Sequence, residues 1–273
     1  MPPLLQSCLR AAGAALLLVL WSCWRGLRIG PIDASDGTAG AGLLAGVLFE
    51  VEFGCIFVGL QYTTASRMSV FPYLAPFVVA LGMPLISRHE RLSPAQLAGL
   101  VLAFGGIVWA FAEGFSQPAA GSLQWLGDAL GLAGAVLWAS TTLLVRGTGL
   151  ASALPEKTLL YQLVVSGLAL LAASALSTEV WPRGLSPLVG WLMLFQIAVV
   201  TFGSYLAWFW LVRHYPATQV SAFTLLTPIF GLLAGVLLLL GEPLTLRLVV
   251  ALAAVCAGLA LVNLATRPPR PAA

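Results

Sequence analysis

The sequence predicts an all-α, polytopic membrane protein, and three observations lead to that prediction. First, 60% of the 273 residues are hydrophobic and only 8% are charged, whereas a water-soluble domain carries roughly 25% charged residues. Second, apolar runs of roughly 20 residues follow one another, and this is the length that an α-helix needs to cross a bilayer. Third, the second half of the chain repeats features of the first half. We therefore expect a bundle of membrane-spanning helices built from two repeats.

Charged residues, prolines and glycines separate nine apolar runs along the chain. These runs lie at 4–24, 40–62, 66–87, 93–113, 125–146, 158–178, 188–212, 217–240 and 244–265. The first run could serve as a secretory signal, but no small-residue cleavage site follows it, so we count it as a span. The connections are short, and no separate soluble domain fits between the spans.

The internal repeat has a fixed register of 152 residues without a gap. In this register "ASRMSVFPYLAPF" (65–77) lies over "ATQVSAFTLLTPI" (217–229). The other informative pairs are Pro76 with Pro228, Glu90 with Glu242, and Gly106 with Gly258. Each repeat holds five spans, and an odd number places the two copies in opposite orientations. Inverted repeats of this kind are a common plan of secondary transporters.

The register predicts two domains, with one helix missing from the first. The span at 125–146 has no counterpart, because the equivalent positions would precede Met1. We expect residues 1–114 to form the first repeat with four spans, its first helix being absent. Residues 115–273 then form the second repeat, with five spans and a short cytoplasmic tail.

The distribution of basic residues predicts the orientation in the membrane. Nine Lys and Arg residues fall on one side of the membrane: Arg25, Arg28, Arg88, Arg91, Arg146, Lys157, Arg213, Arg267 and Arg270. Only three fall on the other side: Arg67, Arg183 and Arg247. Because Lys and Arg accumulate in cytoplasmic loops, we expect a multi-pass protein of the inner membrane with a cytoplasmic C-terminus.

The repeated segments resemble a known family. The stretch "YLAPF…HERL…GLVLAFGGIVWA" and its echo "LLTPI…GEPL…AGLALV" are similar to the EamA-type branch of the drug/metabolite transporter superfamily. The resemblance covers 3–265 and implies a five-plus-five inverted architecture that exports a small organic metabolite by alternating access. It does not specify the substrate, because members export amino acids, metabolites or drugs. The absent first helix departs from the pattern, so a truncated, transport-inactive paralogue with a packing or partner role is the alternative.

Polar side chains inside the spans are few and costly to insert, so they are the candidates for a substrate or proton site. The register pairs Arg10 with Gln162 and Glu52 with Ser204, which places polar groups at matching positions of the two halves. Aromatic rings beside hydroxyl groups could form the walls of the same site. The candidates are Glu52, Arg10, Gln162, Trp138, Ser204 and Tyr205.

The stretch "VLFEVEFGCIF" (47–57) places two carboxylates in one apolar run. At 100° per residue, Glu50 and Glu52 point about 200° apart and cannot both face one cavity. The resemblance favours Glu52, because "EF" at 52–53 looks like the acidic position of this span in EamA-type members. We expect Glu52 to face a polar cavity, where it could couple transport to protons, or to form an ion pair with Arg10. Glu50 is then expected to be held by a neighbouring helix.

Prolines occur at equivalent positions of the two repeats. Pro76 and Pro228 each remove a backbone hydrogen bond from a helix, and the result is either a hinge for alternating access or a static kink. Glu90 and Glu242 follow span ends, where each could cap the helix that follows it.

Enzymatic chemistry and nucleic-acid binding are not expected. The sequence has no HExxH, GxSxG or P-loop motif, so an intramembrane enzyme acting on lipid is the least favoured function. The four cysteines show no metal-ligand spacing, and no cofactor is predicted. The expected partners are a small-molecule substrate and the lipid bilayer.

Overall fold

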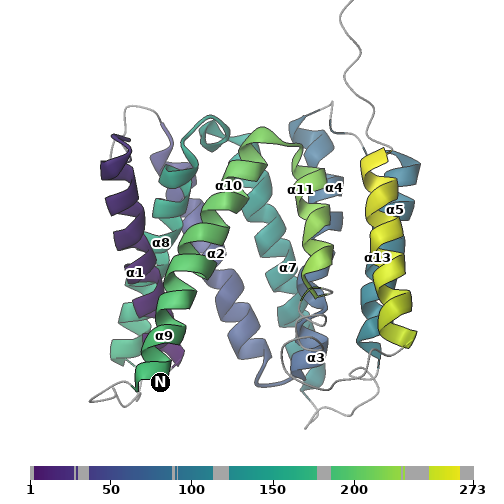
Figure 1. Cartoon of the computed structure of the whole chain (residues 1–273), viewed down its shortest axis with the longest axis horizontal. Helices are drawn as coiled ribbons and strands as arrows, with labels where there is room; N and C mark the ends of the chain where they lie inside the picture. The colour runs from purple at the N-terminus through teal and green to yellow at the C-terminus, as the bar shows by residue number, and fades with distance from the viewer. Residues whose placement is uncertain are drawn as a thin grey trace, which may run out of the picture. The chain divides into compact units, whose positions relative to one another are not determined.

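The structure, a computed structural model, describes residues 3–27, 29, 37–87, 90, 92–112, 123–176, 186–228, 230 and 246–264. Within these ranges all regular secondary structure is helical (Figure 1). Helical segments occur in each of the nine predicted spans. The prediction of an all-α protein is therefore confirmed. Glu242 and part of the predicted span 217–240 lie outside the described residues.

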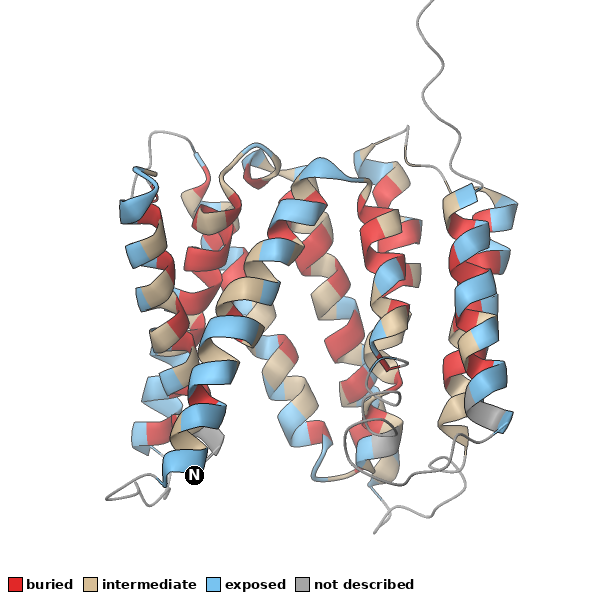
Figure 2. Cartoon of the chain, in the orientation of Figure 1, coloured by how far each residue is buried: buried red, intermediate tan, exposed pale blue. Residues whose placement is uncertain are grey.

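Five helical stretches are long and apolar enough to cross a membrane: Leu5–Trp24, Ala39–Gly59, Gln124–Gly147, Pro155–Leu176 and Pro187–His214. Shorter apolar helices cover Phe71–Ile86, Pro94–Ala110, Ala217–Leu226 and Val249–Leu264. Both groups of helices carry exposed residues (Figure 2). Large apolar side chains are among the exposed ones, for example Leu85, Leu168 and Trp191. Such surfaces suit a lipid environment, so the chain is a polytopic membrane helix bundle.

The helices pack into two compact units, each drawn from both halves of the sequence. One unit comprises Met1–Val51 and Leu144–His214, and the other comprises Glu52–Leu143 and Tyr215–Ala273. Helix α2 (Ala39–Gly59) contributes residues to both units, as does α7 (Gln124–Gly147).

In the first unit, α1 (Pro3–Trp24) packs along α8 (Pro155–Leu176) (Figure 1). Both ends of α8 lie 152 residues after the ends of α1, which is the predicted register. Two glycines of α2 allow close approach to α8. A Cβ atom on Gly42 would overlap the Tyr161 ring, and one on Gly46 would lie 2.7 Å from Val165. The predicted span 188–212 consists of α9 (Pro187–Phe195), a π-helical segment η4 (Gln196–Ser204) and α10 (Tyr205–His214).

In the second unit, α5 (Pro94–Ala110) packs against α13 (Leu246–Leu264) (Figure 1). A Cβ atom on Gly99 would lie 2.5 Å from the backbone oxygen of Gly258, and one on Gly106 would lie 3.0 Å from that of Ala251. Contacts therefore run to lower numbers on α13 as they run to higher numbers on α5, so these two helices are antiparallel. Small residues at a helix–helix interface permit such close contact in membranes.

The two proline-bearing spans have the same local structure. In the first, α3 (Ala65–Met68) is followed by the 3₁₀ segment η2 (Phe71–Leu74) and then by α4 (Ala75–Ile86). In the second, α11 (Ala217–Phe223) is followed by η5 (Thr224–Leu226), and α-helix resumes at Thr227. Pro76 and Pro228 are each the second residue after the 3₁₀ segment, and both are buried. A proline is tolerated in the first turn of a helix, because the N–H group that it lacks has no partner there.

Glu90 caps a different helix from the one that the sequence predicts. The helix that follows Glu90 is α5, and Ser93 caps it: the Gln96 N–H donates to Ser93 Oγ at 3.2 Å. Glu90 instead accepts the N–H of Ala217, the first residue of α11, at 3.1 Å. The acid therefore stabilises the N-terminus of a helix that is distant in the sequence.

Candidate functional site

Glu50 has partners on two neighbouring helices. Its carboxylate is half-buried and interacts with the Ser166 hydroxyl of α8 and with the positive charge of Arg10 on α1. The Ser166 hydroxyl is buried and lies near the Glu50 carboxylate, although it does not reach ordinary hydrogen-bond geometry with any of the described residues. The sequence suggested an ion pair between Arg10 and Glu52. In the structure the positive charge of Arg10 instead interacts with the Glu50 carboxylate.

Glu52 has a different environment, as the 200° separation on the helix requires. Its side chain is only 7% exposed, and its Oε2 atom has no hydrogen-bond partner within the described ranges. Helix α7 passes close by: a Cβ atom on Gly134 would lie 3.4 Å from Ile56 and 3.7 Å from the backbone oxygen of Glu52. Burying a carboxylate oxygen without a partner is costly, and a bound proton or cation would lower that cost.

The other candidates from the sequence are divided between the units. Arg10, Gln162, Ser204 and Tyr205 lie in the first unit, and Trp138 lies with Glu52 in the second. Gln162 is 1% exposed on α8, whereas Ser204 is exposed and donates its hydroxyl to the backbone of its own helix at Val200.

Two aromatic candidates make packing contacts. The ring of Tyr205 meets that of Phe49 edge to face, with centroids 5.7 Å apart. Tyr205 therefore contacts the residue that directly precedes Glu50 on α2. Trp138 packs at the edge of a buried cluster around Ala75, Met83 and Ala217. Trp138 therefore packs into the core of its unit.

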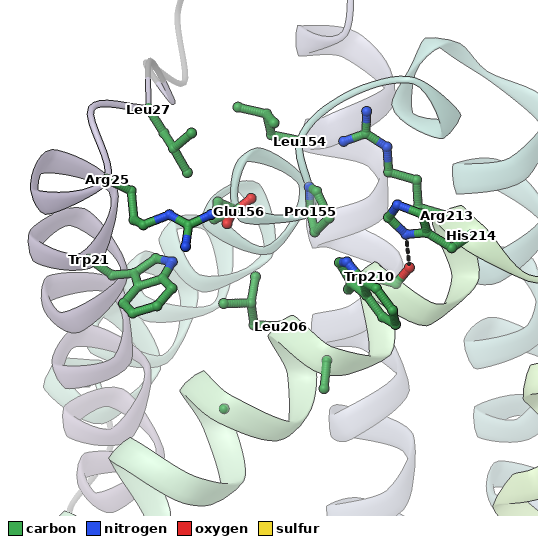
Figure 3. Close-up of a pocket in the computed structure, with 12 residues that line it drawn as sticks. Trp21, Arg25, Leu27, Leu154, Pro155, Glu156, Leu206, Trp210, Arg213 and His214 are labelled. Atoms are coloured by element: carbon green, nitrogen blue, oxygen red, sulfur yellow. Dashed lines mark hydrogen bonds between the residues drawn. The ribbon is translucent and has the colours of Figure 1, made fainter.

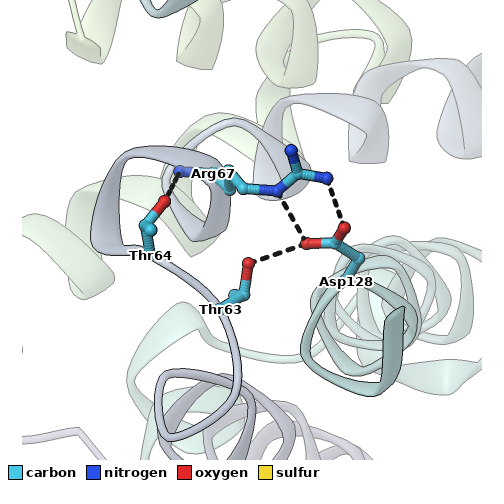
Figure 4. Close-up of polar contacts among 4 residues, drawn as sticks. All are labelled: Thr63, Thr64, Arg67 and Asp128. Carbon is cyan, nitrogen blue, oxygen red and sulfur yellow. Dashed lines mark hydrogen bonds and ion pairs between the residues drawn. The ribbon is translucent and has the colours of Figure 1, made fainter. Parts of the chain in front are cut away.

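One polar cluster was missed by the sequence analysis. Arg67 of α3 donates from Nε to Asp128 Oδ1 of α7 at 3.1 Å and pairs through Nη2 with Oδ2 (Figure 4). Thr63 donates its hydroxyl to the same Oδ1 atom at 2.8 Å, and the Thr64 hydroxyl caps α3 by accepting the Arg67 N–H at 3.3 Å. The sequence did contain a signal for this pair. Asp128 and Arg67 lie near the starts of two predicted spans, and both spans begin on the same predicted side of the membrane.

Comparison with known proteins gives a consistent result. The profile of the EamA-like transporter family matches residues 1–112 and 125–264. The uncharacterized transporter YvbV of Bacillus subtilis (strain 168) is 27% identical over 274 residues, covering 100% of this chain and 86% of that protein. An uncharacterized protein of Pseudomonas aeruginosa is 31% identical over 252 residues, covering 92% of this chain and 80% of that protein.

A protein of known crystal structure has the same fold. Its TM-score is 0.81 at 20% identity, over 98% of this chain and 89% of that chain. The family consists of transporters and not of enzymes. The match extends over both halves of the sequence and agrees with an apolar helical bundle. The chain therefore belongs to the EamA-like transporter family.

Proposed function

We propose that this protein is a secondary transporter that exports a small organic metabolite by alternating access, with Glu52 as its proton-binding or cation-binding group. The observation that carries the proposal is the buried Oε2 atom of Glu52, which has no partner among the described residues of a transporter-family chain.

The physical argument starts from the cost of the charge. An ionised carboxylate inside a membrane helix costs about 2.5–3.5 kcal/mol on insertion scales. Binding of a proton, or of a cationic group on the solute, removes most of that cost. Glu50 already has the Arg10 charge and Ser166 nearby, so it needs no further ligand. Glu52 is therefore the better coupling residue, and Glu50 has a structural role.

Alternating access requires two halves of related structure, and the contacts of α5 with α13 support this. In the 152-residue register Gly106 corresponds to Gly258, and Gly99 corresponds to Ala251. Gly106 faces the Ala251 backbone, and Gly258 faces the Gly99 backbone. If the two helices change places, each of these contacts becomes the other one. A two-fold axis between the antiparallel helices α5 and α13 has this effect.

We further propose where the repeats, the hinges and the solute-binding residues lie and how the chain is oriented in the membrane. Residues 1–114 and 115–273 are the two inverted repeats. Pro76 and Pro228 act as hinges, because each lies where a 3₁₀ segment gives way to α-helix. The protein lies in the inner membrane with its C-terminus in the cytoplasm, and Arg10, Gln162, Trp138, Ser204 and Tyr205 contribute to solute binding.

The test compares the two carboxylates in cells. Wild-type protein, Glu52→Gln and Glu50→Gln are expressed in a bacterial strain, and growth is measured across a panel of growth-inhibitory amino acids, nucleosides and organic cations. We expect wild-type protein and Glu50→Gln to raise tolerance to the same compound. Glu52→Gln should reach equal membrane levels by immunoblotting yet give no protection.

A second measurement separates coupling from transport. Proteoliposomes loaded with a pH-sensitive dye receive the compound found in the growth assay, and proton movement is recorded. Loss of proton movement in Glu52→Gln supports the coupling role. Normal transport and normal proton movement in Glu52→Gln would contradict it, and loss in Glu50→Gln alone would reverse the assignment.

A further inference from the structure

A cavity of about 550 Å³ lies within the first unit (Figure 3). Its volume is in the range of small-molecule sites, roughly 300–1,000 Å³. The end of α1 contributes Trp21 and Arg25, the start of α8 contributes Glu156, and the last turns of α10 contribute Trp210, Arg213 and His214. None of these residues belongs to the site proposed around Glu52.

The charged groups around this cavity are not paired with one another. Arg25 and Arg213 are two cations on opposite flanks of the cavity in Figure 3, and Glu156 is the one acidic residue among the described residues that line it. In the part of the chain that the structure describes, neither arginine forms an ion pair with Glu156. The Arg25 guanidinium lies 5.4 Å from the centroid of the Trp21 ring, which holds it at the cavity edge.

An independent observation also points to a missing acceptor. The indole N–H of Trp21 is buried and has no hydrogen-bond partner among the described residues. Figure 3 shows this nitrogen on the side of the ring toward the Arg25 guanidinium. Buried N–H groups nearly always have an acceptor, so an acceptor supplied by a ligand would complete this arrangement.

The donor set defines the chemistry of the ligand. Two guanidinium groups and one indole N–H can donate hydrogen bonds but accept none. Guanidinium groups bind phosphate oxygens in a planar, bidentate geometry. The tryptophan rings and Leu206 supply apolar walls, and tryptophan and arginine are both common where membrane helices meet the headgroup region.

We propose that this cavity binds an anionic ligand whose phosphate group lies against Arg25 and the Trp21 indole, while Arg213 attracts its negative charge from the opposite flank. A phospholipid headgroup and a soluble phosphate ester share this chemistry. The binding does not depend on the role proposed for Glu52.

The experiment measures binding by native mass spectrometry of the full-length protein in an uncharged detergent. The probes are phosphatidylglycerol, phosphatidylcholine and glycerol phosphate. We expect Arg25→Gln to weaken binding about tenfold or more, the size of one lost charge-assisted hydrogen bond. Arg213→Gln should weaken it by a smaller factor, because this charge acts from the opposite flank. Arg25→Lys and Arg213→Lys should retain part of the affinity, and Glu156→Gln should bind as tightly as wild type or more tightly.

The controls separate this site from general charge and from misfolding. Arg146→Gln removes a positive charge from a residue that does not line the cavity and should leave binding unchanged. Trp21→Phe keeps an aromatic ring but removes the N–H donor, so it tests the site if an arginine variant fails to fold.

The probes then distinguish the two sources of phosphate. Preference for phosphatidylglycerol with no competition from glycerol phosphate identifies a lipid site, and displacement by glycerol phosphate identifies a soluble ester. Equal binding of every probe to wild type and to the Arg25, Arg213 and Trp21 variants would overturn the proposal.

Discussion

The ion pair between Arg67 and Asp128 offers the sharpest test of the packing in the second unit. Its side chains are 17% and 21% exposed, which places it between a surface pair and a fully buried pair. Surface pairs contribute about 0–1 kcal/mol and breaking a buried pair costs about 3–5 kcal/mol. Because the contact is bidentate and Thr63 also donates to Asp128 at 2.8 Å, we expect a coupling of about 1–3 kcal/mol.

The assay is a double-mutant cycle in detergent with Arg67→Gln, Asp128→Asn and the double variant. Each single change should lower the midpoint of thermal unfolding by several degrees, since about 1 kcal/mol corresponds to roughly 2–4 °C in chains of 150–250 residues. The double variant should lose little more than either single variant. Thr63→Val should have a smaller effect, about 0.5–1.5 kcal/mol, because it removes one hydrogen bond.

The reasoning is refuted if the two single changes are additive within about 0.5 kcal/mol, which is the expectation for independent sites. The charge-reversed pair, Arg67→Asp with Asp128→Arg, is a further check. It should recover part of the stability that either reversal alone removes.

The remaining predictions concern packing, capping and topology. Gly258→Ala should destabilise the protein by about 1–3 kcal/mol through overpacking, because its added Cβ would lie 2.7 Å from the Ala103 backbone nitrogen; Gly105→Ala, which meets no atom within 4 Å, is the matched control and should be neutral or stabilising. Ser93→Ala should cost about 0.5–2 kcal/mol by removing the cap of α5, measured by the same unfolding assay. A reporter fused after Ala273 should be active in the cytoplasm, and activity in the periplasm would mean that a span is miscounted.

The sequence was a good guide to the helices. Apolar runs bounded by charge located helical structure in all nine predicted spans, because span length and hydropathy are local properties. The 152-residue register also anticipated the equal bounds of α1 and α8. It did not anticipate the π-helical segment Gln196–Ser204, whose equivalent in α2 is regular α-helix. Both stretches are apolar, and periodicity does not distinguish the two helix types.

The candidate site was only partly accessible from the sequence. Helical geometry required Glu50 and Glu52 to have different neighbours, and the structure shows two different environments. Which groups those neighbours are could not be deduced, because Ser166 and Arg10 come from helices far away in the sequence. Asp128 was overlooked for the same reason: its partner Arg67 is 61 residues away, and no motif links the two.

The sequence by itself therefore determined the membrane class and the places of the helical segments, since both depend on composition and order along one helix. Only the tertiary structure decided which polar groups are satisfied. In the structure Glu90 contacts the N-terminus of α11 and Asp128 pairs with Arg67. One oxygen of Glu52 has no partner among the described residues. In an apolar medium each such pairing depends on which helices lie side by side, and that is set by the packing of small residues such as Gly99 and Gly258.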